Sequence, residues 1–451
     1  MESRNKGMGK VALGVLSSLS ESYTLLPFMV FSSLISEKTG KVDFLVPVIV
    51  IYSIERACLI GLRGLGEIKN PQRIMKGGLS IAILGSLLML ISYYYYPLLM
   101  VSAVFVGIGL APLRAMFVPL FSALVEKNKE LKKAKNIGTL LYLAIMVVAM
   151  ALGRLSLPVV PVLFLLYLCY CLHVVTAIDG DELFGKERAF DRSSSNPAFI
   201  VFGILALVCL LILRQYQTSG ISYLMWATPI IVVTFTVIEI YRHRDYRDYS
   251  YSAYWVGAVK SFLMLYSLVY HTSVGDGASA MLVYLALAVS SMVSPIVGKI
   301  MGRKLGGKVL IKLCLILSSL FSFLLVVPQA SISLLGLFLS STWANVISSE
   351  VGARYMEDSR YIKNERALVR FRLQTAGSII EQLFLFFTIY IMGDVSIHEN
   401  ILAPYAAGVP DAWVSLPLRA SGFICSLLLL ASALAIVFFS GKERQKSDKV
   451  M

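Results

Sequence analysis

Six ionisable side chains stand inside long apolar stretches of this 451-residue sequence, where a charge is energetically costly. They are three acids and three bases: Glu21, Glu55, Arg56, Arg114, Lys260 and Glu381. Inserting one such residue at the centre of a membrane helix costs about 2.5–3.5 kcal/mol, so these residues usually mark a pathway, a binding site or a buried pair. The balance of acids and bases favours pairing between helices. In such a place a carboxyl can carry a proton, and a guanidinium or ammonium can hold an anion.

Two of the acids are candidates for binding and releasing a proton. Glu21 and Glu381 are predicted to face a polar cavity and to couple the binding of a proton to that of a second molecule. Arg114 and Lys260, together with Tyr23, are predicted to hold an anionic group such as a carboxylate. A structural alternative stays open, in which Glu21 and Glu381 only form buried ion pairs, the latter with Lys260.

Glu55 and Arg56 are neighbours in the sequence and pose a separate problem. On a helix, adjacent side chains point about 100° apart, so these two residues cannot be partners of each other. Each therefore needs a partner from another helix. The alternative is that both lie near the end of their helix and take part in contacts of the following loop.

The overall composition identifies the setting of these charges. Hydrophobic residues make up 57% of the chain and charged residues 15%, against about 25% charged in soluble proteins, and the mean hydropathy is +0.75. A folded surface must face water, so a soluble enzyme, a disordered chain and a fibrous protein are excluded. The six cysteines lie in apolar runs and the four histidines are scattered. We therefore expect no disulfide framework, no metal site and no cofactor.

Apolar runs of about 20 residues, the length that crosses a bilayer, recur along the chain. We expect about fourteen transmembrane helices, at 10–36, 43–64, 74–95, 97–124, 137–155, 157–178, 197–214, 222–241, 251–273, 278–300, 309–328, 330–352, 373–393 and 415–440. Successive connections are alternately rich and poor in Lys and Arg, which predicts an even number of crossings with both termini cytoplasmic, in the cell membrane. The net charge of +14 lies in these short loops and not in a basic stripe interleaved with aromatics, so nucleic acid is not an expected partner.

The expected helices fall into two sets of six, separated by a pair. We predict an all-α polytopic membrane protein with a six-helix bundle over 1–178, an inserted helix pair with its flanking loops over 179–250, and a second six-helix bundle over 251–451. Each set has a basic, glycine-rich loop after its second helix, at 61–73 and 298–308. Duplicated six-helix halves typically enclose a substrate cavity near the middle of the membrane, which opens to each side in turn.

The second of these loops resembles the charge-clamp loop of the major facilitator superfamily, which follows the pattern Gly-x-x-x-Asp-Arg-x-Gly-Arg-Arg. Gly302 stands in place of the acid, one extra residue precedes the later glycine, and the matching positions are Gly298, Arg303, Gly306 and Lys308. Within the superfamily the chain looks most like the proton-coupled oligopeptide transporters, whose bacterial members carry two extra helices between the halves. The segment Gly107–Arg114 is similar to their Gly-x-Gly-x-x-Lys-Pro segment, whereas their Glu-x-x-Glu-Arg motif is absent from the first span.

The resemblance implies a secondary active transporter that moves a small organic solute, a peptide among the candidates, by alternating access with coupled protons. The implied partners are the solute, protons and the lipid bilayer, and the implied state is a monomer. Two alternatives stay open: a drug or lipid exporter of the same superfamily, and a membrane-embedded enzyme. Such enzymes commonly hold their catalytic groups on long polar loops, and this chain has none longer than about twenty residues.

Overall fold

The apolar stretches of the sequence form α-helices. The computed structural model describes residues 9–38, 45–153, 159–215, 234, 247–273, 277–359, 361–394 and 412–447. These residues divide into two compact units. Unit 1 comprises Met1–Leu211 and Ser359–Val369, and unit 2 comprises Ile212–Asp358 and Arg370–Met451. A short segment from late in the chain therefore completes the first unit.

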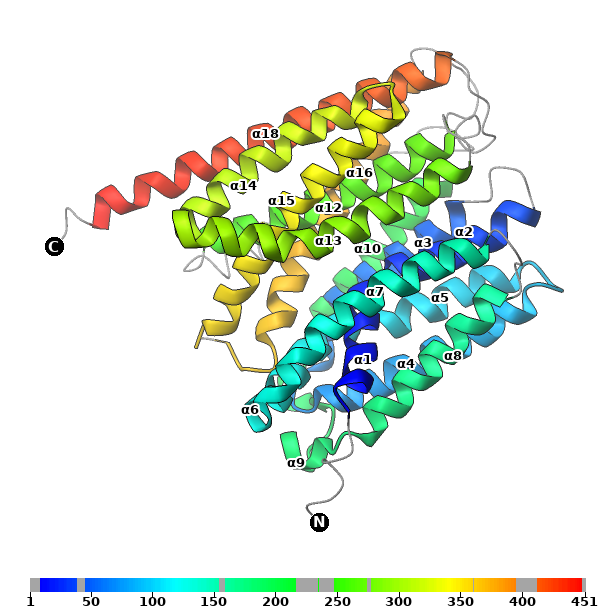
Figure 1. The fold of residues 1–451 in the computed structure, drawn as a ribbon, viewed down its shortest axis with the longest axis vertical. Helices are drawn as coiled ribbons and strands as arrows, with labels where there is room; N and C mark the ends of the chain where they lie inside the picture. Colours follow the sequence, from blue (N-terminus) through cyan, green and yellow to red (C-terminus); the bar gives the residue numbers. More distant parts are fainter. Residues whose placement is uncertain are drawn as a thin grey trace. The chain divides into compact units, whose positions relative to one another are not determined.

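Unit 1 contains the described helices that begin before residue 211, the last of which continues to Gln215. They are α1 (Lys10–Ser22), α2 (Leu25–Lys38), α3 (Leu45–Gly61), α4 (Pro71–Ile91), α5 (Leu98–Leu110), α6 (Leu113–Lys127), α7 (Lys132–Gly153), α8 (Val159–Ala177), α9 (Gly180–Phe184) and α10 (Pro197–Gln215). Three short 3₁₀ helices join them: η3 (Leu62–Leu65), η4 (Lys129–Leu131) and η5 (Arg192–Ser194). Along this unit α1 packs against α7, and α4 packs against both α5 and α8 (Figure 1).

Two of the expected spans each divide into two consecutive helices. The span at 10–36 divides into α1 and α2 at Tyr23 and Thr24. Pro27 has no N–H to give to the carbonyl of the residue four positions earlier, Tyr23, so the helical ladder is interrupted there. The span at 97–124 divides into α5 and α6 at Ala111 and Pro112, for the same reason. Broken helices of this kind often line the binding sites of membrane transporters.

Glycines allow α5 to lie very close to two neighbouring helices. A Cβ atom on Gly107 would sit 3.1 Å from the carbonyl oxygen of Ile51 in α3. A Cβ atom on Gly109 would sit 2.5 Å from the backbone nitrogen of Ala82 in α4. Small residues at helix contacts let backbones approach in a membrane, where lipid gives no hydrophobic drive for association. The two glycines thus fix α5 between α3 and α4.

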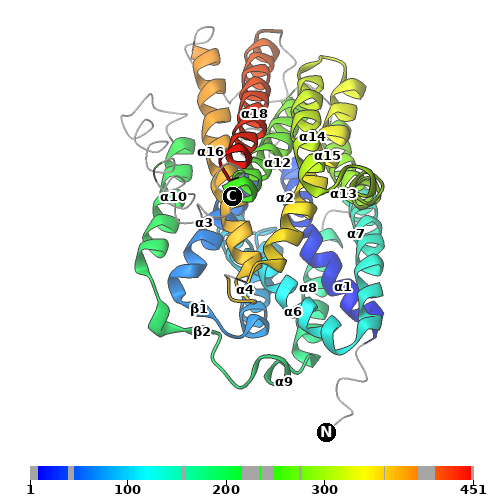
Figure 2. The same cartoon turned by 90° about the vertical axis from the view of Figure 1, so that its left-hand side faces the viewer.

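A two-stranded sheet ties together two connections of unit 1. Strand β1 (Glu67–Ile68) pairs antiparallel with β2 (Phe190–Asp191), and the pairs are Glu67 with Asp191 and Ile68 with Phe190 (Figure 2). Gly66 precedes β1 with φ +123°, and a side chain there would strike the carbonyl of Asp191. The chain then enters α4 through Asn70, whose side chain accepts a hydrogen bond from the Arg73 N–H. The expected basic loop at 61–73 is therefore ordered along its whole length.

Unit 2 contains the later helices: α12 (Arg247–Ser273), α13 (Gly277–Leu305), α14 (Gly307–Ser322), α15 (Ala330–Glu357), α16 (Arg366–Asp394) from Arg370 onward, and α18 (Ala412–Ser447), with the 3₁₀ helix η8 (Phe323–Val326) after α14. Helix α15 packs against α13, α14 and α12 (Figure 2). Serine hydroxyls join these helices: Ser318 and Ser340 exchange hydrogen bonds with each other's carbonyl oxygens. Hydroxyl contacts of this kind hold transmembrane helices together.

Eight segments of the described chain are long and apolar enough to cross a membrane. Thirteen of the fourteen expected spans coincide with helices or pairs of consecutive helices. The remaining expected span, at 222–241, lies outside the described residues except for Thr234, so the count of fourteen stays a prediction. The division of the chain into parts 1–178, 179–250 and 251–451 also stays a prediction. The second helix of the expected inserted pair lies almost wholly outside the described residues.

Candidate functional site

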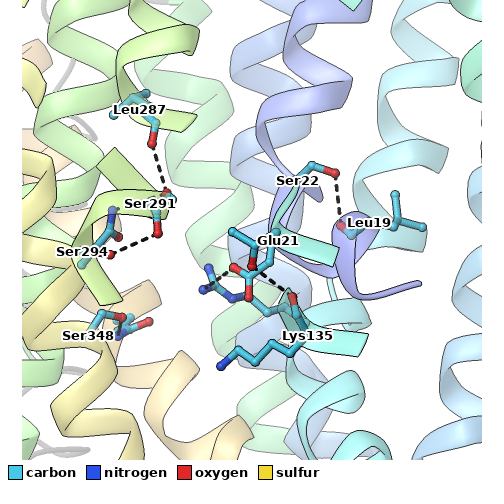
Figure 3. Close-up of polar contacts among 12 residues, drawn as sticks. Leu19, Glu21, Ser22, Lys135, Leu287, Ser291, Ser294 and Ser348 are labelled. Atoms are coloured by element: carbon cyan, nitrogen blue, oxygen red, sulfur yellow. Dashed lines mark hydrogen bonds and ion pairs between the residues drawn. The ribbon is translucent and has the colours of Figure 1, made fainter. Parts of the chain in front are cut away.

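A polar cluster lies where the two broken helices of unit 1 are interrupted. We name it the break cluster and define it as Glu21, Tyr23, Thr24, Glu55 and Arg114. Glu21 is in the last turn of α1, and Arg114 is in the first turn of α6. Arg114 Nη2 donates a hydrogen bond to Glu21 Oε2 at 3.2 Å, forming an ion pair. Glu21 is labelled in Figure 3. The structure thus joins a predicted proton-binding residue to a predicted anion-binding residue.

The Glu21–Arg114 pair is partly accessible. The Glu21 side chain is 31% exposed and the Arg114 side chain 29% exposed. A charged pair open to hydrocarbon would be costly, so such residues face a bundle interior or a watery space. Neither partner is therefore sealed in the described structure. Tyr142 of α7 lies within electrostatic range of both charges and is itself 2% exposed.

The turn between α1 and α2 supplies two further members of the break cluster. The ring of Tyr23 lies with its centroid 6.0 Å from the Arg114 guanidinium carbon, at the limit of a cation–π contact. Thr24 Oγ1 donates a hydrogen bond to Glu55 Oε2 at 2.9 Å. Glu55 is fully buried in α3. The two residues of the turn therefore face acidic and basic groups from different helices.

Arg56 finds its partner on its own helix. Its guanidinium carbon lies 4.6 Å from the centroid of the Tyr52 ring, one turn earlier in α3. The prediction that Glu55 and Arg56 cannot pair with each other agrees with this geometry, since Glu55 bonds to Thr24. The expectation that each needs another helix holds for Glu55 only. A guanidinium over an aromatic face keeps part of its electrostatic stabilisation without a carboxylate.

The remaining predicted site residues lie in unit 2. Lys260 is half-buried in α12. Glu381 is in α16 and 7% exposed, beside the Cys425 thiol of α18 and Tyr254 of α12, and its Oε1 has no hydrogen-bond partner. Further hydroxyls line α13, where Ser291 bonds to the Leu287 carbonyl and Ser294 to the Ser291 carbonyl (Figure 3). The roles of Lys260 and Glu381 stay predictions.

The predicted charge-clamp loop is almost entirely helical. Gly298 and Arg303 belong to α13, Gly306 alone turns the chain with φ +71°, and Lys308 is already in α14. A positive φ is readily adopted by glycine and poorly by other residues, which explains the glycine there. Within the described residues neither Arg303 nor Lys308 forms an ion pair. The clamp itself stays a prediction.

Unit 1 includes a docked segment, Ser359–Val369, that the sequence did not identify as important. The Glu365 carboxylate Oε1 accepts from the Ile68 N–H at 3.3 Å and lies 3.3 Å from Arg63 Nη1. Asn364 Nδ2 donates to the carbonyl oxygens of Ile68 and Lys69. Glu365 is 7% exposed. The docked segment therefore covers strand β1 with a buried acid.

Hydrogen bonds shift the pKa values of two ionisable groups beside the small sheet. The Glu67 carboxylate accepts from Lys69 and raises the pKa of that ammonium above its ordinary value. The Ser193 hydroxyl and N–H donate to Asp191 Oδ1 and lower the pKa of Asp191. Such bonds favour the charged form of each group. Among the described residues no cluster of three or more His, Cys, Asp or Glu side chains could hold a metal ion.

Comparisons with known proteins bear on the fold. No family model and no curated protein matches this sequence. Solved structures do match: a POT family transporter in complex with 5-aminolevulinic acid aligns at 12% identity over 97% of this chain and 96% of that one, with a TM-score of 0.64. The chain has the fold of the major facilitator transporters. The resemblance inferred from the sequence is confirmed at the level of fold.

Two further structures with the major facilitator fold show how widely this architecture is shared. The peptide transporter POT in complex with sulfate aligns at 14% identity over 95% of this chain and 94% of that one, with a TM-score of 0.59. The human organic anion transporter MFSD10 aligns at 14% identity over 97% of this chain and all of that one, with a TM-score of 0.54. Together with the apolar helices, these matches identify a multi-pass membrane protein.

Sequence reasoning missed two acids that the structure makes prominent. The sequence marks Glu55 as a costly charge without giving it a site role, and it does not mark Glu365 at all. A signal for Glu55 was present, because it stands well inside an apolar stretch rather than at its end. Glu365 gave no local signal, since its partners Arg63 and Ile68 lie about three hundred residues earlier.

Proposed function

We propose that this protein is a secondary transporter that moves a small organic anion or zwitterion across a membrane by alternating access, coupled to protons. The observation that carries the proposal is the partly exposed Glu21–Arg114 ion pair between two helix breaks. Carboxylates and guanidiniums held at broken helices are what a membrane protein needs to recognise a charged solute away from bulk water. No enzymatic activity is part of this proposal.

The proposed coupling is an exchange of partners at Arg114. When the Glu21 carboxylate takes up a proton, it loses its charge and its hold on the guanidinium. Arg114 then offers its N–H donors to the carboxylate of the solute, which a guanidinium can bind through two parallel hydrogen bonds. Release of the proton on the other side restores the Glu21–Arg114 pair and displaces the solute. Tyr23, beside Arg114, adds an aromatic face to the same site.

In unit 2 we propose matching roles for Glu381 and Lys260. Glu381 has a buried carboxyl with one unpartnered oxygen, which suits a group that is neutral for part of a cycle. Lys260 would hold an anionic group through its positive charge. The turn at Gly306, with Gly298, Arg303 and Lys308, would serve as the charge-clamp region. The protein would act as a monomer in the cell membrane with both termini in the cytoplasm.

The ligands of proteins with a similar fold support an anionic or zwitterionic solute. A POT family transporter was solved with 5-aminolevulinic acid, another with a thioalcohol-conjugated peptide, and the peptide transporter POT with sulfate. Each of these structures shares at most 14% identity with this chain, so the ligands suggest a class to screen and no particular solute.

The test is uptake by proteoliposomes under an imposed pH gradient, after a thermal-shift screen of dipeptides and small carboxylic acids has supplied a solute. A ligand that binds the folded state raises its melting temperature by mass action, whatever the direction of transport. We expect uptake to require the gradient and Glu21→Gln to abolish that requirement. The matched control is Glu130→Gln, which removes a charge from the exposed Lys10–Glu130 pair. Gradient-driven uptake that survives in Glu21→Gln would reject the coupling role of Glu21.

A further inference from the structure

Glu55 is the buried member of the break cluster, and its two carboxyl oxygens have different surroundings. The residue has no exposed surface. Its Oε2 accepts a hydrogen bond from Thr24 Oγ1 at 2.9 Å, and its Oε1 has no hydrogen-bond partner. An ionised carboxylate has about four acceptor positions to satisfy. A single donor is far too little for a full negative charge out of water.

The groups around Glu55 do not neutralise it directly. Arg56 follows it in α3 but lies over the Tyr52 ring, and Cys58 is one turn further along the same helix. Helix α5, which packs against α3, has no titratable side chain in Leu98–Leu110. Tyr23 faces this region from the α1–α2 turn, and Arg63 of η3 is paired with Glu365. Glu55 forms no ion pair with any residue in the described part of the chain.

We propose that Glu55 is a second proton-binding site, distinct from Glu21, and that it carries a proton at neutral pH. A neutral carboxyl fits the observed geometry, because its O–H can donate to Thr24 Oγ1 across the same 2.9 Å contact that the carboxylate accepts. The oxygen left over is then an ordinary carbonyl oxygen, whose lack of a partner is far less unfavourable than that of a carboxylate.

Because Thr24 lies in the turn between α1 and α2, the protonation of Glu55 affects the conformation of that turn. Thr24 directly follows Tyr23, whose ring lies near Arg114, and it is three residues from Glu21. When Glu55 loses its proton, its carboxylate needs more hydrogen-bond donors than the single Thr24 hydroxyl that the turn supplies. The turn must then move or admit water. Protonation of Glu55 thus favours one arrangement of the turn that positions Glu21. The use of this proton rests on the proposed transport function, but its presence does not.

Infrared spectroscopy of the purified protein in lipid nanodiscs tests the proposal without any transport. A protonated carboxyl has a carbonyl stretch that is separate from the bands of carboxylates and amides. We expect a protonated-carboxyl band at neutral pH with a component that Glu55→Gln removes and Glu130→Gln leaves in place. Thr24→Val should shift that component, because the hydroxyl bonded to the carboxyl is lost. The Thr24→Val shift also supplies the readout if Glu55→Gln does not fold.

Two results would overturn the proposal: a spectrum of Glu55→Gln that superimposes on that of the unmodified protein, or a band that Thr24→Val leaves unshifted. Glu381 is a separate buried carboxyl, and Glu381→Gln identifies its own component. In proteoliposomes, Glu55→Gln should lower the number of protons moved per solute by one. If the infrared component is present but no gradient drives uptake in the unmodified protein, the transport proposal fails and the Glu55 site stands. The converse result rejects Glu55 alone.

Discussion

Arg114 donates to Glu21 across 3.2 Å, and each of the two residues lies at the interruption of a different broken helix. Glu21 closes α1 before the Tyr23–Thr24 turn, and Arg114 opens α6 after Pro112. One ion pair therefore connects two places where the backbone is not held by a continuous helical ladder. The pair is thus a direct polar link between the two interruptions.

Replacing Arg114 should weaken binding of anionic solutes selectively. We expect Arg114→Met to lower the apparent affinity for carboxylate solutes at least tenfold, or about 1.4 kcal/mol. Arg114→Lys should give an intermediate loss, because an ammonium keeps the charge without the two-pronged geometry. Uptake measured against solute concentration in proteoliposomes gives both values. The control is Arg73→Met, which disrupts the exposed Arg73–Asp181 pair and should leave affinity unchanged. An equal loss in both variants would contradict a binding role for Arg114.

Removing the charge of Glu365 should loosen the docked segment. In Glu365→Gln the ion pair with Arg63 is lost and the bond from the Ile68 N–H is weakened. Disrupting a buried charged hydrogen bond costs about 1–3 kcal/mol. Hydrogen exchange should therefore become faster in residues 66–70 and 361–369. Lys363→Ala in the same segment breaks only the exposed Lys363–Glu126 pair, so its effect should stay below about 1 kcal/mol. Equal exchange rates in the two variants would count against the role of Glu365.

The sheet connection should lose stability in acid through Asp191. Hydrogen bonds from Ser193 hold the pKa of Asp191 below its ordinary value, which is about 3.9. A lowered pKa in the folded state means that the stabilisation is complete above the ordinary value and is lost as pH falls through the lower, folded-state value. Ser193→Ala should raise the Asp191 pKa toward the ordinary value. The carboxyl carbon signal of Asp191 in NMR, assigned with Asp191→Asn, reports this pKa, and Ser195→Ala should leave it unchanged.

A methyl group on Gly109 should disrupt the contact between α4 and α5. Its Cβ would lie 2.5 Å from backbone atoms of Gly78 and Ala82, and overpacking of this kind costs about 1–3 kcal/mol. The control is Gly77→Ala in α4, where a Cβ meets nothing within 4 Å. That change should be neutral or stabilise the helix by up to about 1 kcal/mol. Thermal unfolding in detergent measures both, and a Gly109→Ala protein as stable as Gly77→Ala would refute the close packing.

Hydropathy was sufficient to place most helices because a membrane helix must be apolar along its length. The expected span at 157–178 corresponds to α8 at Val159–Ala177. The same reasoning could not see the interruptions at Tyr23 and Pro112, since a broken helix and a continuous one have equal hydropathy. Pro27 and Pro112 were visible signals of these breaks, but proline is also tolerated inside unbroken membrane helices.

Only part of the candidate site could be predicted from the sequence. Glu21 and Arg114 were identified singly, because each is costly in an apolar span. Their pairing joins residues 93 positions apart, and no local pattern encodes it. The place of Glu55 in the site could not be predicted, because it follows from the burial of the side chain and from its hydrogen bond with the Thr24 hydroxyl. At the charge-clamp region only the extent of the loop was misjudged: helices α13 and α14 occupy most of 298–308, and Gly306 alone separates them.

The docked segment Ser359–Val369 also bears on which fragments of the polypeptide can fold alone. A polypeptide ending at residue 215 would contain every helix from α1 to α10 but would leave Arg63 without its acid and the Ile68 N–H without its acceptor. Such a fragment should be poorly folded when synthesised alone. Co-synthesis with a fragment that begins at residue 216 would restore Glu365 and Asn364, so the two pieces should rescue each other in trans although no peptide bond joins them.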